Sequence, residues 1–82
     1  MAENQVIDFL RGMIRSGAEI RRVEFQPFAI ERGKKYDDFV ERQVRVELES
    51  GDVELGIFTC TKDRFIKWQI ETGIFLKNHW GI

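Results

Sequence analysis

Val44 to Thr59 reads Val-Arg-Val-Glu-Leu-Glu-Ser-Gly-Asp-Val-Glu-Leu-Gly-Ile-Phe-Thr, two runs in which apolar and polar residues alternate. Alternation is typical of β-strands, and Ser50-Gly51 separates the runs, so this stretch predicts a β-hairpin. With a two-residue turn at Ser50-Gly51, three facing pairs on one side of the hairpin are all apolar. These pairs are Leu48 with Val53, Val46 with Leu55, and Val44 with Ile57.

The length of this turn decides which side chains share a sheet face. A three-residue turn from Glu49 to Gly51 would set Leu48 opposite Asp52 and mix apolar with polar side chains on both faces. We therefore predict the two-residue turn and one buried sheet face. That face would be made by residues 44, 46, 48, 53, 55 and 57.

Length and composition predict one small α+β domain over residues 1–82. The chain is 43% hydrophobic and 33% charged, as expected of a folded chain with a single core. Cys60 is its one cysteine, which excludes a disulfide within the chain. The N-terminus lacks the basic and apolar regions of a signal peptide, and no apolar run is long enough to cross a membrane. We expect a cytoplasmic protein without membrane contact.

Residues 3–16 predict an amphipathic helix, because their apolar side chains fall on one side of a helical wheel. Asp8, Arg11 and Arg15 fall on the other side, and Gly17 is placed to end the helix. The apolar residues are Val6, Ile7, Phe9, Leu10, Met13 and Ile14.

Glu19 to Ile30 predicts a strand with Val23 and Phe25 on one face. Pro27 lacks the N–H that a sheet needs, so it should place this strand at an edge or end its regular part.

Thr61 to Gly73 is compatible with a helix or a strand. Thr61 can cap a helix, Asp63 suits its first turn and Gly73 can end it, whereas residues 66–71 also alternate as in a strand. We favour the helix, followed by a short apolar tail, because two helices would cover one sheet face. The predicted fold is then αβββα with a three-stranded antiparallel sheet. The alternative is one helix on a five-stranded antiparallel sheet.

The predicted element order resembles the topology of the double-stranded-RNA-binding domain. Residues 62–67, Lys-Asp-Arg-Phe-Ile-Lys, differ from the Lys-rich start of that family's second helix. We do not assign the chain to the family, since the order of elements alone carries no function.

Few residues have catalytic or metal-binding chemistry. A general acid-base site would need His79, the one histidine, to meet Arg45 and either Glu47 or Glu54. Cys60 is read as a buried structural residue, because nothing in the sequence lowers its pKa. We expect no enzyme activity, no cofactor and no metal site.

A basic block between residues 11 and 35 is the feature most compatible with nucleic-acid binding, since phosphate contacts need clustered Lys and Arg. It holds seven basic and three acidic residues. The basic residues are Arg11, Arg15, Arg21, Arg22, Arg32, Lys34 and Lys35.

We predict a small binding or accessory domain that acts through protein–protein contact or forms a homodimer. Exposed aromatic residues and the edge strand near Pro27 would make the contact. The candidates are Phe28, Tyr36, Phe58 and Trp80. The alternative is a nucleic-acid-binding accessory protein that uses the basic block.

Overall fold

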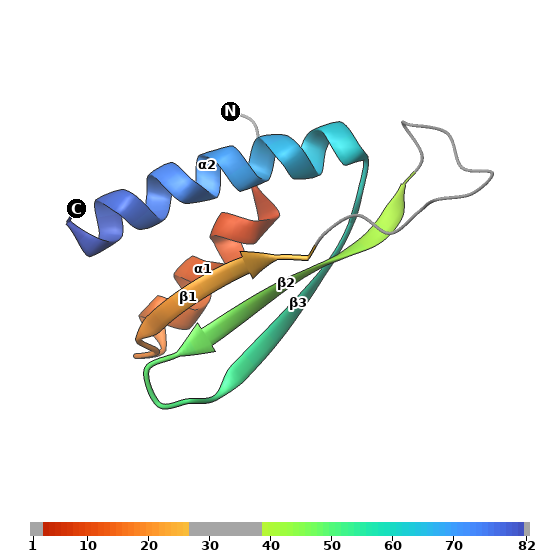
Figure 1. The fold of residues 1–82 in the computed structure, drawn as a ribbon. Coiled ribbons are helices and arrows are strands. Elements are labelled where there is room, and N and C mark those ends of the chain that lie inside the picture. Colours follow the sequence, from red (N-terminus) through yellow and green to blue (C-terminus); the bar gives the residue numbers. More distant parts are fainter. Residues whose placement is uncertain (1–2, 27–38, 82) are drawn as a thin grey trace.

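The computed structural model describes residues 3–26 and 39–81. Helix α1 (Gln5–Arg15) precedes three strands, β1 (Ile20–Phe25), β2 (Val40–Leu48) and β3 (Val53–Cys60), and helix α2 (Lys62–Trp80) ends the order (Figure 1). The strands form an antiparallel sheet in the order β1-β2-β3. The predicted α+β fold with αβββα order is confirmed.

Helix α1 has a defined cap at each end. The side chain of Asn4 accepts a hydrogen bond of 3.0 Å from the Ile7 N–H. At the other end Gly17 has φ +93°, and Ala18 N–H donates to the Met13 carbonyl at 3.0 Å. This is the Schellman arrangement, and it confirms that Gly17 ends the helix.

Helix α2 begins as predicted but extends further. The Thr61 hydroxyl accepts from the Arg64 N–H at 3.2 Å, and Asp63 lies in the first turn. The predictions of an end at Gly73 and of an apolar tail are wrong, because the helix continues to Trp80 and ends at Gly81, whose φ is +70°. A glycine inside a helix costs about 1 kcal/mol relative to alanine. The burial of Leu76, three residues after Gly73, offsets this cost. The five-stranded alternative is wrong for the same reason.

The register predicted for the hairpin is wrong by one residue. The Leu48 N–H donates to the Asp52 carbonyl and the Gly51 N–H donates to the Leu48 carbonyl, both at 2.9 Å, which closes a three-residue turn. A two-residue Ser50-Gly51 turn of type I′ would need positive φ at Ser50 as well as at Gly51. In this turn only Gly51 has positive φ, +95°. The glycine therefore suits the third position of the longer turn.

The register reverses the faces of β3. Its buried residues are Gly56, Phe58 and Cys60, whereas three of the six residues predicted to form the buried face are exposed on the other side. Of the other three, Val44 and Val46 are buried and Leu48 is partly buried. The exposed three are Val53, Leu55 and Ile57.

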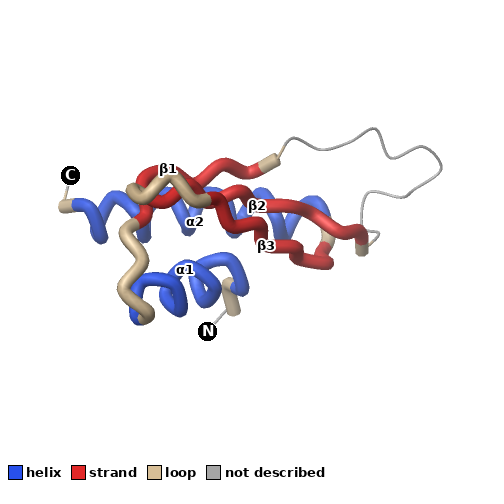
Figure 2. The backbone as a smooth tube through the Cα atoms, turned by 90° about the horizontal axis from the view of Figure 1, so that it is seen from below, coloured by secondary structure: helices blue, strands red, loops and turns tan. Residues whose placement is uncertain are grey.

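Both helices pack on the inner face of the sheet, the face that carries Val44, Val46 and Phe58. The Phe58 ring lies 5.9 Å from the Phe9 ring of α1 and 6.4 Å from the Trp68 ring of α2, both edge to face. Figure 2 shows α2 running along most of the length of the sheet. The opposite, outer face of the sheet carries no helix among the described residues.

Strand β1 lies at a sheet edge, as Pro27 indicated, and ends at Phe25. Its pairing with β2 contains an irregularity between Ile20 and Arg22. Val23 and Phe25 pair with inner-face residues of β2, so they share one face as predicted, and both are partly buried against the core. Pro27 itself lies outside the described residues.

Substitutions of Thr72, a buried residue of α2, test how its hydroxyl and its methyl group contribute to the stability of the core. Its side chain is 1% exposed, and its hydroxyl has no hydrogen-bond partner among the described residues. Thr72→Val keeps the shape and removes this hydroxyl, so we expect a rise of about 1 kcal/mol in the free energy of unfolding. Thr72→Ser keeps the hydroxyl and loses the methyl group, so we expect a fall of about 1 kcal/mol. Urea denaturation measures the free energy of unfolding of both variants. A valine variant less stable than the parent would contradict the finding that the Thr72 hydroxyl is buried without a hydrogen-bond partner among the described residues.

Candidate functional site

The outer side of β3 carries a row of exposed aliphatic side chains. Val53 is 42% exposed, Leu55 58% and Ile57 59%. Alternate residues of a strand point to the same face, so these three side chains form one continuous row. Because β2 is the one strand beside β3 among residues 3–26 and 39–81, the row lies along an edge of the described sheet.

The backbone of the same three residues faces away from β2. Leu48 N–H donates to the Asp52 carbonyl, so Asp52 and every second residue after it make the hydrogen bonds to β2. Val53, Leu55 and Ile57 alternate with these residues, and their N–H and C=O groups point outward from the sheet. This edge therefore offers apolar side chains and backbone hydrogen-bonding groups together.

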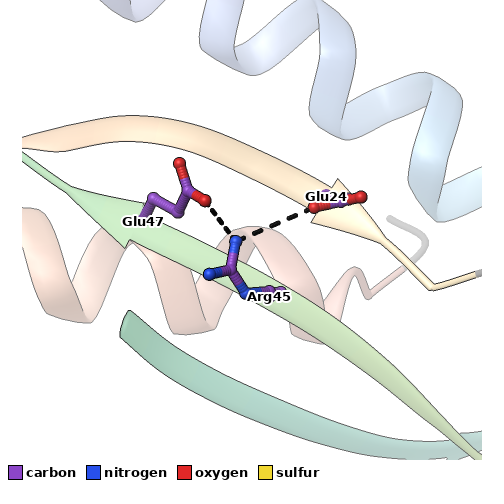
Figure 3. A network of polar contacts seen from close by, with 3 residues as sticks. All are labelled: Glu24, Arg45 and Glu47. Carbon is purple, nitrogen blue, oxygen red and sulfur yellow. Dashed lines mark hydrogen bonds and ion pairs between the residues drawn. The ribbon is translucent and has the colours of Figure 1, made fainter. Parts of the chain in front are cut away.

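The strand beside the row is polar. On β2 the outer side chain of Arg45 forms ion pairs with Glu47 and, at 3.8 Å, with Glu24 of β1 (Figure 3). The Arg45 hydrogen bond is the largest effect on Glu47 and holds the pKa of that carboxyl below its usual range. The outer face thus has a charged side over β1 and β2 and an apolar side over β3.

The Arg45–Glu47 pair predicts a pKa change. Arg45→Gln should raise the pKa of the Glu47 carboxyl toward its usual value, and a carbon-detected NMR titration measures this. Arg22→Gln is the control with a smaller rise, because Arg22 acts on Glu47 only through its charge. Since the folded pKa lies below the unfolded one, the pair contributes stability above the unfolded pKa and loses it as the pH falls through the folded pKa. Equal pKa values in Arg45→Gln and the parent would contradict the pairing.

The structure places two of the four predicted protein-contact residues. The expectation that Phe58 is exposed for protein contact is wrong: it is 7% exposed, because the register turns it toward Phe9 and Trp68 on the inner face. Trp80 is 41% exposed, and its indole N–H donates to the Ile20 carbonyl at 3.2 Å. Phe28 and Tyr36 lie outside the described residues.

The basic block is only partly described. Arg11 and Arg15 are exposed on α1, and Arg21 and Arg22 are exposed on β1. The Arg11 guanidinium lies 5.4 Å from the centre of the Phe75 ring, in a cation–π contact. The three remaining residues, Arg32, Lys34 and Lys35, lie outside the described residues.

The residues considered for acid-base chemistry lie on different sides of the sheet. Arg45 and Glu47 are on the outer face, whereas His79 belongs to α2 on the inner face and stacks on Phe75 with ring centres 6.3 Å apart. Cys60 is buried, and desolvation raises the pKa of its thiol, which keeps it a weak nucleophile. Residues 3–26 and 39–81 contain no group of three His, Cys, Asp or Glu placed to hold a metal ion.

A shallow depression of about 540 Å³ lies between α1 and α2. Arg11 is its one basic lining residue, and Ile74, which is 59% exposed, forms part of its wall. The acidic residues that line this depression are not part of any cluster of three His, Cys, Asp or Glu that could hold a metal ion among the described residues. Its lining residues are Glu3, Asn4, Ile7, Asp8, Arg11, Glu71 and Ile74.

The exposed row was missed in the sequence because its three residues were assigned to the core. The signal that would have found it is the order Ser-Gly at the turn. Serine in first place does not suit either common two-residue hairpin turn, because types I′ and II′ both need positive φ there, whereas glycine in third place suits the longer turn.

No protein-family model, curated protein or solved structure matches this chain. Within the described part of the chain, neither helix is both long and apolar enough to pass through a bilayer.

Proposed function

We propose that this protein is a non-enzymatic, cytoplasmic binding domain that pairs an extended protein segment with strand β3. The observation that supports this most strongly is the coincidence, on one strand, of an exposed aliphatic row and outward backbone groups. Extended segments that bind to a sheet edge gain affinity from main-chain hydrogen bonds and specificity from alternate side chains. β3 offers both kinds of contact.

The composition of β3 also supports the proposal. Proteins protect open edges with Lys, Pro, bulges or short strands, because an open edge invites pairing with other chains. Val53–Cys60 contains neither Lys nor Pro, and Glu54 is its one charged residue. The opposite edge, β1, carries the adjacent charges Arg21 and Arg22. Of the two edges, β3 is thus the one suited to pairing.

A peptide selection tests this function. Random extended peptides displayed on phage are selected against the immobilised protein, and the enriched ones are titrated against variants. We expect Leu55→Lys to weaken binding at least tenfold, because the lysine adds a charge in the apolar row. Ile70→Lys is the matched control: Ile70 is 63% exposed on α2, and its substitution should leave binding unchanged. Peptides that bind Leu55→Lys as tightly as the parent would exclude the β3 edge as the site.

The alternative function, nucleic-acid binding through the basic block, predicts a different result. The protein would then be retained on heparin and would shift RNA or DNA in a gel, with binding that falls steeply as salt rises. Arg11→Glu and Arg15→Glu would abolish the shift, whereas Leu55→Lys would not. That pattern would favour the alternative over the β3 proposal.

A further inference from the structure

We infer that the segment paired with β3 is β3 of a second copy of this chain, antiparallel and centred on Leu55, so that two sheets join into one of six strands. This inference rests on the proposed function. It adds the partner, its direction and its register, each of which follows from the pattern of side chains along Val53–Cys60.

The exposed row is self-complementary about Leu55. A twofold axis at this residue sets Leu55 opposite Leu55 of the second copy, and Val53 opposite Ile57 of the second copy. The three facing pairs are then aliphatic throughout, and each covers side-chain surface that is 42–59% exposed in the single chain. On the inner face the same axis sets Glu54 opposite Gly56 of the second copy, where no side chain opposes it.

The backbone suits the same axis. Val53, Leu55 and Ile57 are the residues whose N–H and C=O groups point away from β2. Pairing two such residues directly opposite each other makes a hydrogen-bonded pair, in which each N–H donates to the other carbonyl. All three facing pairs are of this kind, so the outward groups of all three residues are satisfied.

Charges at the two ends of β3 are complementary in an antiparallel pair. The hairpin turn carries Glu49 and Asp52 just before β3. The start of α2, just after β3, carries Lys62, Asp63 and Arg64, and the positive end of the helix dipole. Antiparallel pairing brings the acidic end of each copy beside the more basic end of the other. A parallel pair would instead place like ends together.

A neighbouring register is less suitable. An axis at Gly56 would set Val53 opposite Thr59 and Glu54 opposite Phe58 of the second copy. The first pair replaces an aliphatic contact by a polar one, and the second places a carboxylate beside an aromatic ring. The axis at Leu55 keeps all three aliphatic pairs. It sets Phe58 opposite Asp52 of the second copy, so a carboxylate faces this ring in both registers and the aliphatic pairs alone favour the axis at Leu55.

Cysteine cross-linking tests the partner and the register together. Directly opposed hydrogen-bonded residues have Cα atoms about 5.5 Å apart, within the range of about 4.4–6.8 Å that a disulfide spans. Leu55→Cys alone should therefore form a disulfide-linked dimer under mild oxidation. Val53→Cys mixed with Ile57→Cys should form a mixed dimer. Val53→Cys alone should not, because its two copies would lie about 13 Å apart along the strands.

Two controls accompany the cross-linking. The parent chain should remain unlinked, because its Cys60 is 1% exposed. Ile70→Cys should also remain unlinked, since that residue belongs to α2 and not to the paired strand. Sedimentation of the parent should show a monomer–dimer equilibrium that tolerates salt, and Leu55→Lys should weaken dimerisation at least tenfold.

The outcomes separate this inference from the function on which it rests. A parent chain that sediments as a monomer at every concentration, or a disulfide between Leu55→Cys and Ile57→Cys in preference to Leu55→Cys with itself, would overturn the Leu55-centred dimer. Selected peptides that still require Leu55 would leave the β3 edge as a binding site for another protein. Peptides that bind without regard to Leu55 would overturn the function as well.

Discussion

Phe65→Ala is expected to lower the free energy of unfolding by about 3–5 kcal/mol. Phe65 is 1% exposed, and its ring lies 5.2 Å from the Phe25 ring. The Arg42 guanidinium, which is buried and donates to the Cys60 carbonyl at 3.2 Å, lies 5.8 Å from the centre of the same ring. Truncation would leave a cavity where α2 meets the sheet and would remove a contact of a buried charge.

This loss is large for so short a chain. Domains have a free energy of unfolding of about 0.05–0.15 kcal/mol per residue, so 82 residues correspond to about 4–12 kcal/mol. Urea denaturation followed by circular dichroism measures the effect. Phe65→Leu retains most of the apolar volume and is the control, with an expected loss of about 1–1.5 kcal/mol. An alanine variant as stable as the leucine variant would contradict the central position of Phe65.

Gly56→Val is expected to lower the free energy of unfolding by about 2–3 kcal/mol. A Cβ atom at Gly56 would lie 2.8 Å from the Phe58 ring and 3.1 Å from the Phe9 ring. Phe58 has little freedom to move, because it is buried between Phe9 and Trp68. The glycine therefore provides the space in which an aromatic ring covers the strand.

Leu55→Thr is the matched control on the neighbouring residue. Its side chain is 58% exposed, so the substitution should change stability by less than about 0.5 kcal/mol when the protein is dilute enough to be monomeric. The register predicted from alternation alone requires the opposite, a tolerant Gly56 and a sensitive Leu55. Thermal unfolding of the two variants thus tests the register directly, and a more sensitive Leu55 would refute the three-residue turn.

Dimerisation through β3 makes the effect of a substitution at Leu55 depend on protein concentration. Leu55→Thr would leave the dilute monomer unchanged but would lower the apparent melting temperature of the concentrated protein, because association stabilises the folded chain by mass action. Gly56→Val would lower the melting temperature at every concentration. The two substitutions therefore separate the roles of the two faces of β3.

Much of the fold follows from local features of the sequence. The 3.6-residue spacing of apolar side chains predicts α1, and Gly17 predicts its end, because a residue with positive φ closes the last turn. Thr61 and Asp63 predict the start of α2, because they satisfy and complement the free N–H groups of its first turn. Pro27 indicates an edge strand through its missing N–H. Each of these signals acts within a few residues, so the chain alone carries it.

The hairpin register and the candidate site depend on the tertiary structure. The shift of one residue exchanges the two faces of β3, and its physical reason combines the turn, where only Gly51 has positive φ, with the packing of Phe58 between Phe9 and Trp68. Alternation fixes that residues 53, 55 and 57 share a face but carries no information about which face the helices cover. Similarly, Gly73 can end a helix or continue it, and the burial of Leu76 beyond it decides the outcome. Contacts between residues far apart in the chain determine which face of β3 is buried and where α2 ends. As a result, Val53, Leu55 and Ile57, which were predicted to lie in the core, form an exposed row at the sheet edge.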